Sequence, residues 1–201
     1  MLDGKVRRIL DPLLDRLGAE LARRGATADL VTVAGFVLGA VAALLITLEA
    51  YGFGLAFVLA SRICDGLDGS VARHTVRTDR GGYLDIVLDF AFYGLVPLGF
   101  VLARPAENGV AGAVLLLSFY VNGASFLAYA AIAEKRRLTS AVRGPKSLYF
   151  TTGLAEASET IAAFVLFCLF PDHFPLLAYV FAGMCGLTAC ARVVLAIREF
   201  R

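Results

Sequence analysis

Four aspartates have the types and the spacing that could do chemistry in this chain. Asp65 and Asp68 stand three residues apart, and Asp85 and Asp89 stand four residues apart. Each spacing places both carboxylates of a pair on one face of a helix. The neighbouring stretches are apolar enough for a membrane, where an ionised side chain costs at least about 2.5 kcal/mol. Positive charge is therefore expected among these acids.

A divalent metal ion is the positive charge that suits these ligands best. In the predicted helices Asp65 and Asp89 each lie eight residues from the cytoplasmic end, a depth of about 12 Å, and Asp68 and Asp85 lie nearer that end. A short loop makes the two helices antiparallel neighbours, so the acids can form two tiers. Oxygen ligands with little room for His or Cys favour Mg²⁺ or Mn²⁺, and four carboxylates could neutralise two ions.

Arginines offer an alternative explanation of the same acids. The aspartates could cap helices or form ion pairs with the nearby arginines, which are Arg62, Arg73, Arg77 and Arg80. Such pairing explains two of the acids easily, but it does not explain Asp65 and Asp89, which lie deepest. The metal site is therefore the preferred interpretation.

Small residues accompany the first acid pair. Gly66, Gly69 and Ala72 fall near the aspartate face of the same helix, and Arg73 follows directly. Glycines in a membrane helix permit close packing and can also make room for a ligand, while a guanidinium suits a phosphate. The metal, the gap and the arginine together predict a bound pyrophosphate.

The elements that must position these groups are apolar helices. Of the 201 residues 59% are hydrophobic and only 18% are charged, which excludes an ordinary soluble domain and a disordered chain. A net charge of +2 and the absence of Trp disfavour nucleic-acid binding. Crossing a bilayer takes about 20 residues. We predict one catalytic domain, residues 26–201, with six transmembrane helices at 29–49, 52–73, 82–103, 109–134, 152–171 and 174–197.

Residues 1–25 differ from these spans. Leu13, Leu17 and Leu21 recur at helical spacing among basic residues, which predicts an amphipathic helix in the membrane interface; Pro12 should interrupt or kink it. With both termini in the cytoplasm, all of the 19 Lys and Arg residues except Arg104 fall on the inner side, as the positive-inside rule favours. We expect an all-α integral protein of a bacterial or archaeal-type inner (cytoplasmic) membrane, with the acids facing the cytoplasm.

The spacing of acids, glycines and arginine resembles the signature of a known enzyme family. Residues 65–73 read D-G-L-D-G-S-V-A-R, and residues 81–89 read G-G-Y-L-D-I-V-L-D. This resembles the CDP-alcohol phosphotransferases, whose signature is D-x-x-D-G-x-x-A-R, eight residues, G, three residues, D, three residues, D. The stretch from Arg73 to Asp85 is one residue shorter than usual, and Gly81 is the better match to the family glycine. Thr32 and Gly35 match a second, weaker family motif.

The resemblance implies a reaction and a set of roles. Such enzymes transfer a substituted phosphate, often phosphatidyl from CDP-diacylglycerol, to an acceptor alcohol and release CMP. It implies two Mg²⁺ or Mn²⁺ ions held by Asp65, Asp68, Asp85 and Asp89, with Asp89 also the catalytic base that deprotonates the acceptor. It also implies a homodimer. The implied CDP site consists of Thr32, Asp65, Gly69, Ala72, Arg73 and Gly81.

Two questions stay open at this point. Glu156, Glu159 and Arg192 form either a structural ion pair or part of an acceptor pocket, and Arg143 and Lys146 are either ordinary cytoplasmic loop residues or ligands of an acceptor or lipid phosphate. A cation transporter that uses the buried acids is the alternative function. It would need an access route from the outside, whereas the predicted polar groups all open to one side.

Overall fold

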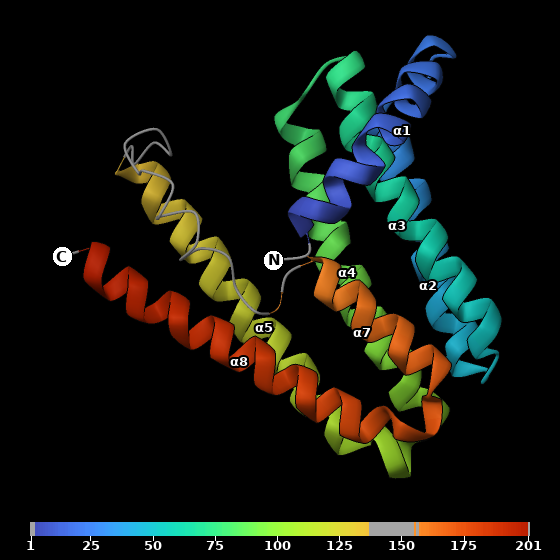
Figure 1. The fold of residues 1–201 in the computed structure, drawn as a ribbon, viewed down its shortest axis with the longest axis vertical. Helices are drawn as coiled ribbons and strands as arrows, with labels where there is room; N and C mark the ends of the chain where they lie inside the picture. The colour runs from blue at the N-terminus through green and yellow to red at the C-terminus, as the bar shows by residue number, and fades with distance from the viewer. Residues whose placement is uncertain (1–2, 137–154, 156, 201) are drawn as a thin grey trace.

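The protein is a bundle of helices in which no strand occurs among the described residues. A computed structural model describes residues 3–136, 155 and 157–200, with the backbone alone for residues 3–10. The elements in chain order are α1 (Asp3–Arg23), α2 (Ala28–Thr47), α3 (Tyr51–His74), α4 (Asp79–Ala103), α5 (Pro105–Lys135), α7 (Ala157–Leu169), the 3-10 helix η1 (Pro171–His173) and α8 (Phe174–Glu199) (Figure 1).

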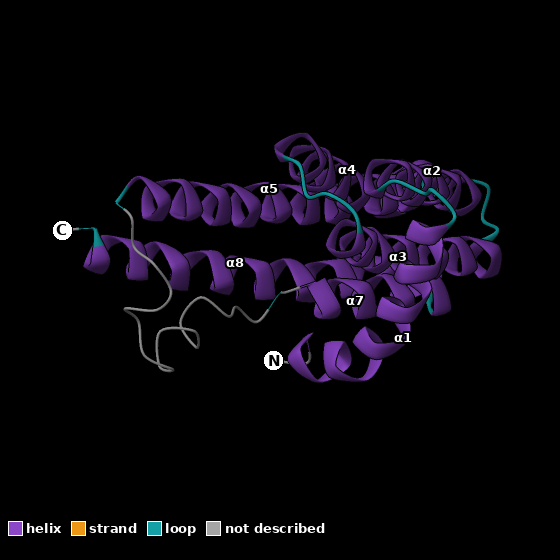
Figure 2. Cartoon of the chain, turned by 90° about the horizontal axis from the view of Figure 1, so that it is seen from above, coloured by secondary structure: helices purple, strands orange, loops and turns teal. Residues whose placement is uncertain are grey.

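The helices form two groups. Helices α2, α3 and α4 pack together with α7 beside α3, and α1 crosses the end of α3. Helices α5 and α8 run side by side and extend away from the other helices (Figure 2). Both run in the same direction, since the ring of Tyr129 lies near that of Phe200 and Arg136 donates to the carbonyl of Phe200 at their C-terminal ends.

Two glycines of α2 allow the close packing that brings α2, α3 and α4 together. A Cβ atom on Gly35 would lie 3.0 Å from the Cβ of Cys64 on α3, and one on Gly39 would overlap the ring of Phe92 on α4. Phe92 is fully buried. Small residues at such contacts let helix backbones approach closely, so this packing sets the distance between the acids of α3 and α4.

Helix α1 is present as predicted, and it packs on α3. It is continuous through Pro12, so the proline does not interrupt it. A Cβ atom on Gly18 would overlap the side chain of Ser70, and one on Gly66 would lie 2.9 Å from Leu14. The side chain of Leu14 from α1 therefore occupies part of the space beside Gly66.

Four of the described helices are long and apolar enough to cross a membrane, namely α2, α4, α5 and α8 with its preceding turn. Helix α3 is 24 residues long but carries charged residues in its second half, and α7 has 13 residues. The count of six spans and the cytoplasmic position of both termini stay predictions.

Two predicted helix starts were wrong by a few residues. Helix α4 begins at Asp79 instead of residue 82, because the Thr78 hydroxyl caps it by accepting a 3.0 Å hydrogen bond from the amide of Gly81. Helix α5 begins at Pro105 instead of residue 109, with proline in the first turn, where its missing amide hydrogen costs nothing.

One cation joins three turns at the end of the bundle far from the acids. Arg104 lies 2.9 Å from Glu49 and 2.5 Å from Asp172, and so connects the turns after α2, after α4 and before α8. Stacked and edge-on phenylalanines, including Phe100, Phe167 and Phe174, fill the core beneath it.

Candidate active site

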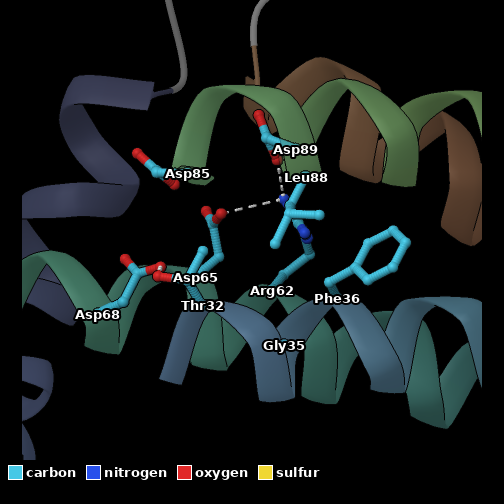
Figure 3. A pocket seen from close by; sticks show the side chains of 9 residues that line it. All are labelled: Thr32, Gly35, Phe36, Arg62, Asp65, Asp68, Asp85, Leu88 and Asp89. Atoms are coloured by element: carbon cyan, nitrogen blue, oxygen red, sulfur yellow. Dashed lines mark hydrogen bonds and ion pairs between the residues drawn. The ribbon is translucent and has the colours of Figure 1, made fainter. Parts of the chain in front are cut away.

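The predicted acids meet in a small pocket between α2, α3 and α4. All four aspartates line it, two from the C-terminal half of α3 and two from the first three turns of α4, together with neighbours from α2 (Figure 3). The lining residues are Thr32, Gly35, Phe36, Arg62, Asp65, Asp68, Asp85, Leu88 and Asp89. The acids of α3 and α4 thus open into one common space, and their role there stays a prediction.

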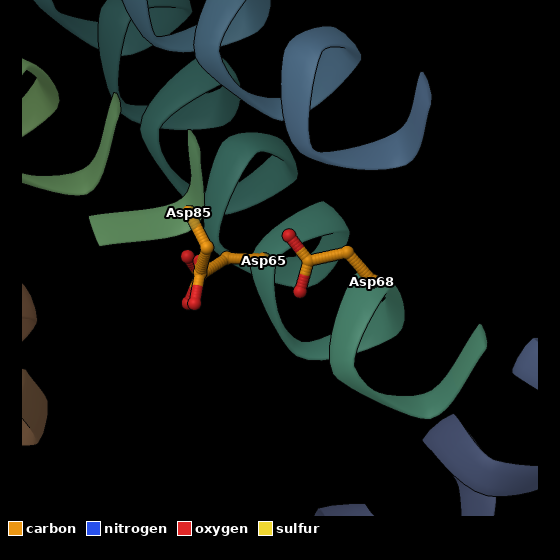
Figure 4. A group of neighbouring side chains, drawn as sticks. All are labelled: Asp65, Asp68 and Asp85. Carbon is orange, nitrogen blue, oxygen red and sulfur yellow. The ribbon is translucent and has the colours of Figure 1, made fainter. Parts of the chain in front are cut away.

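Three of the four acids form a group that can hold a metal ion. One carboxylate oxygen each from Asp65, Asp68 and Asp85 lie within 4.8 Å of one another (Figure 4). Asp68 is buried, and the hydroxyl of Thr32 donates a 2.7 Å hydrogen bond to its Oδ2 atom. Three oxygen ligands in this arrangement suit a hard divalent cation.

Asp89 lies apart from this group and is bound by an arginine. Its Oδ1 atom lies 2.5 Å from Nη1 of Arg62, and the same nitrogen lies 3.4 Å from Oδ1 of Asp65. The expectation that arginine pairing does not account for Asp65 and Asp89 was therefore wrong, since these are the two acids that Arg62 reaches. The reason is that Arg62 lies one turn before Asp65 on the same helix face, from which its guanidinium reaches both acids.

Of the predicted CDP residues of α3, Asp65 lines the acid pocket, Gly69 borders open space and Arg73 contacts α1. A Cβ atom on Gly69 would meet nothing within 4 Å, so the space beside it is open. Arg73 lies 3.1 Å from Asp15 of α1, which also accepts a hydrogen bond from Ser70. The hydrogen bond from Arg73 lowers the pKa of the Asp15 carboxyl below its usual value. Asp15 was not singled out in the sequence, because nothing local shows which face of α1 meets α3.

Gly81 lies in the first turn of α4, close to the start of α2. A Cβ atom there would lie 2.9 Å from Asp29, whose other oxygen pairs with Arg80 at 2.9 Å. Thr32, expected at the CDP site, lines the acid pocket and contacts Asp68. Ala72 is partly buried on α3.

A second, larger cavity adjoins Asp89. It has a volume of about 640 Å³ and lies among α4, α5, α7 and α8. Asp89 lines both this cavity and the acid pocket. Aromatic side chains such as Tyr93 and Phe119 cover much of its wall, and Arg192 of α8 also lines it.

Arg192 is held in that cavity by α5. Its side chain is buried, and Nη1 donates to the carbonyl and the side-chain oxygen of Asn122, both at 3.0 Å, and to the Ser125 hydroxyl at 2.8 Å. Glu159 accepts a 3.1 Å hydrogen bond from Ser158 at the start of α7. The other candidate acceptor residues, Arg143, Lys146 and Glu156, lie outside the described residues.

The profile of the CDP-alcohol phosphatidyltransferase family matches residues 25–197. The chain therefore belongs to this family, and it is an enzyme that transfers substituted phosphate groups. The acid group and the family agree with Mg²⁺ or Mn²⁺ as its cofactor.

Several proteins are similar to this chain. The inner membrane protein YnjF of Escherichia coli is 44% identical over 193 residues, which is 96% of this chain and 94% of YnjF. The archaetidylinositol phosphate synthase of Methanothermobacter thermautotrophicus is 35% identical over 95 residues, 47% of this chain and 45% of that protein.

A solved structure shares the fold. The phosphatidylinositol phosphate synthase PgsA1 of Mycobacterium tuberculosis with CDP-DAG bound superposes with a TM-score of 0.71 at 21% identity, over 90% of this chain and 92% of that chain. Another structure of PgsA1, in complex with manganese and citrate, has a TM-score of 0.64 and covers 90% of this chain and 87% of that chain.

Proposed function

We propose that the chain is a phosphatidyltransferase of phospholipid synthesis, which transfers the phosphatidyl group of CDP-diacylglycerol to the hydroxyl of a polar acceptor. The observation that supports this most directly is the place of Asp89, which lines both the acid pocket and the adjoining 640 Å³ cavity. A base there reaches a donor on one side and an acceptor on the other.

The reaction forms one bond and breaks one bond at the same phosphorus. The acceptor oxygen attacks the phosphorus nearer the lipid, the bond from that phosphorus to the bridging oxygen breaks, and CMP leaves with the bonding electrons. Asp89 accepts the proton of the acceptor hydroxyl. Asp65, Asp68 and Asp85 would hold the metal, and Arg73 and the gap at Gly69 would receive the pyrophosphate.

The metal supplies charge stabilisation in this scheme. Two divalent ions, when bound, neutralise the pyrophosphate and stabilise the developing charge of the attacking and leaving oxygens. The residues of this chain do the rest: Thr32 orients Asp68, the carboxylates fix the pyrophosphate position, and Asp89 lies where the acceptor enters. Positioning and charge neutralisation are the main requirements of phosphoryl transfer.

The cavity chemistry supports a phosphorylated acceptor. Arg192 is a buried cation on its wall, and a guanidinium is suited to a phosphate. The names of two similar proteins, an archaetidylinositol phosphate synthase and a phosphatidylinositol phosphate synthase, indicate acceptors of that class. We infer that the acceptor is a polyol phosphate of the inositol phosphate type. Glu159, in the first turn of α7, stays a candidate acceptor residue.

The distribution of basic residues and the similarity to YnjF support a location for the protein in the cell. The positive residues flank the acid end of the bundle, and the related YnjF is an inner membrane protein. We infer an inner membrane location with six spans, cytoplasmic termini and the acid pocket open to the cytoplasm. A homodimer is proposed on the family resemblance. The alternative of a cation transporter is not favoured, because the chain belongs to a transferase family.

The test is release of CMP by the purified protein in detergent. With CDP-diacylglycerol and Mn²⁺ or Mg²⁺, we expect CMP and a new phospholipid with inositol phosphate, and little product with inositol, serine, choline or glycerol 3-phosphate. Asp89→Asn should remove the activity and leave the protein folded. No CMP with any acceptor would refute the transferase, and turnover with only an uncharged acceptor would refute the phosphate pocket.

A further inference from the structure

Arg62 is a buried cation that the proposed reaction does not use. Its side chain is only 9% exposed, although it lies on the pocket wall. The guanidinium carbon lies 3.8 Å from the ring centroid of Phe92, and Nη2 donates to the Ser61 hydroxyl at 3.3 Å. Among the described residues its Nε atom is a buried donor without a partner. The stacking and the Ser61 contact fix the guanidinium in one place.

That place is the one where a second metal ion would bind. Nη1 lies 2.5 Å from Oδ1 of Asp89 and 3.4 Å from Oδ1 of Asp65, so one nitrogen bridges an acid of each helix (Figure 3). The first ion would bind elsewhere in the pocket, at the group of Asp65, Asp68 and Asp85 described above. No arginine or lysine in the described part of the chain forms an ion pair with Asp68 or Asp85.

We propose that Arg62 competes with the second divalent ion for Asp89, and that it thereby makes the two metal sites unequal. The proposal rests on the two-ion reaction proposed above. An arginine side chain cannot lose its proton in a protein, so its charge is permanent. A metal–oxygen bond to the same Oδ1 atom places a second cation within a few ångströms, where like charges repel strongly in a partly buried site. Arg62 is a positioning residue by this account, because it acts through Asp89.

The consequence is an order of binding. The first ion binds tightly to Asp65, Asp68 and Asp85, and the second binds more weakly because it must displace Arg62 from Asp89. Until the second ion binds, Arg62 neutralises the charge of Asp89 and keeps the carboxylate of Asp89 directed into the pocket.

Mn²⁺ binding without substrates tests the proposal on the full-length protein in detergent. Titration calorimetry and the EPR signal of free Mn²⁺ should show a tight and a weak site in the wild type. In Arg62→Gln the weak site should tighten at least tenfold, and the tight site should tighten less, because Nη1 of Arg62 lies farther from Asp65 than from Asp89. The charge-matched control is Arg80→Gln, which removes an exposed arginine paired with Asp29 and should leave both affinities unchanged.

A double-mutant cycle locates the effect. Asp89→Asn should remove the weak site, and adding Arg62→Gln to it should not restore that site. If Arg62→Gln leaves the weak site unchanged, weakens it, or changes binding equally with and without Asp89, the competition is wrong. A merely supporting role for Arg62 predicts the weakening.

A structural measurement keeps the test independent of variants. In wild-type crystals grown at low and at saturating Mn²⁺, the contact between Arg62 and Asp89 should persist with one ion bound and break with two. Two bound ions with that contact intact would overturn the proposal. The two proposals fail separately, since CMP release without the Mn²⁺ effect refutes only the role of Arg62, and the Mn²⁺ effect without CMP release refutes only the transferase.

Discussion

The hydroxyl of Thr32 donates a 2.7 Å hydrogen bond to Oδ2 of Asp68, and this bond joins the start of α2 to the metal group on α3. Both residues are buried. The bond leaves the second oxygen of Asp68 for a metal ion and fixes its direction. Thr32 therefore acts on the site through a ligand, in addition to any contact with the nucleotide.

Replacing Thr32 tests that role. Thr32→Val keeps the shape and removes the hydroxyl, so the buried carboxylate loses its donor. Partners that orient a metal ligand are typically worth about tenfold or more in affinity, and we expect the tight Mn²⁺ site to weaken by about that factor. Thr32→Ser keeps the hydroxyl and should bind Mn²⁺ as the wild type does. Unchanged affinity in Thr32→Val would show that the hydrogen bond does not orient Asp68.

The close contact of α2 with α4 leads to a second prediction. Gly39→Ala places a methyl group against the ring of the fully buried Phe92, which should cost about 1–3 kcal/mol of stability. Because the guanidinium of Arg62 stacks on the ring of Phe92, Mn²⁺ binding should change as well. Gly52→Ala is the matched control, since a Cβ atom there meets nothing within 4 Å. Thermal unfolding in detergent compares the two, and equal melting temperatures would contradict the packing argument.

The ion pair between Asp15 and Arg73 predicts a dependence on pH. Its hydrogen bond lowers the pKa of Asp15 below 3.8 in the folded protein, so the contribution to docking of α1 is complete above that value and is lost as the pH falls below it. Hydrogen exchange of the amides in α1, after correction for intrinsic rates, should therefore rise as the pH falls below about 4.

The control for this dependence is Asp15→Asn. It should raise the exchange of α1 at pH 7 and abolish the additional rise in acid, since no carboxylate is left to titrate. If α1 in the variant still loosens between pH 4 and pH 3 as in the wild type, another acid is responsible.

The sequence predicted the acids well because their spacing reports on a helix directly. Asp65 and Asp68, and Asp85 and Asp89, lie on single faces whatever the helices pack against, and both helices pack on α2. The position of Arg62 could not be read in the same way. Its contact with Asp89 depends on where Phe92 and Ser61 hold the guanidinium, which follows from the packing of α3 and α4 on α2.

The same distinction explains the outer parts of the site. The helical period of residues 1–25 predicts α1, but the contact of Gly18 with Ser70, which brings Asp15 to Arg73, follows from tertiary packing alone. The six apolar stretches predict helices, whereas the start of α4 depends on the Thr78 cap. Thr78 could have been recognised from the sequence as a helix-capping residue, and it would have placed the start of α4 correctly.

The ion pairs of Arg104 with Glu49 and Asp172 predict a variant that loses stability and keeps its activity. Arg104→Gln removes the ion pairs to Glu49 and Asp172. Exposed ion pairs contribute little to stability, so the unfolding temperature should fall by at most a few degrees, with CMP release unchanged at 25 °C. The hydrogen bonds to both acids raise the pKa of Arg104, which keeps it charged at every working pH. Loss of activity at unchanged stability would contradict the view that these ion pairs are structural.

The last prediction concerns the cavity that Asp89 shares with the acid pocket. Arg192→Gln removes the buried cation of its wall, and a charge-assisted hydrogen bond to a phosphate is worth about 1.5–3 kcal/mol, so the KM of a polyol phosphate should rise about tenfold to a hundredfold. The KM of CDP-diacylglycerol should stay the same. Arg198→Gln, an exposed arginine nearer the end of α8, is the matched control and should change neither value. A rise in both KM values after Arg192→Gln would place Arg192 in the support of the whole bundle, and an unchanged acceptor KM would remove it from the acceptor site.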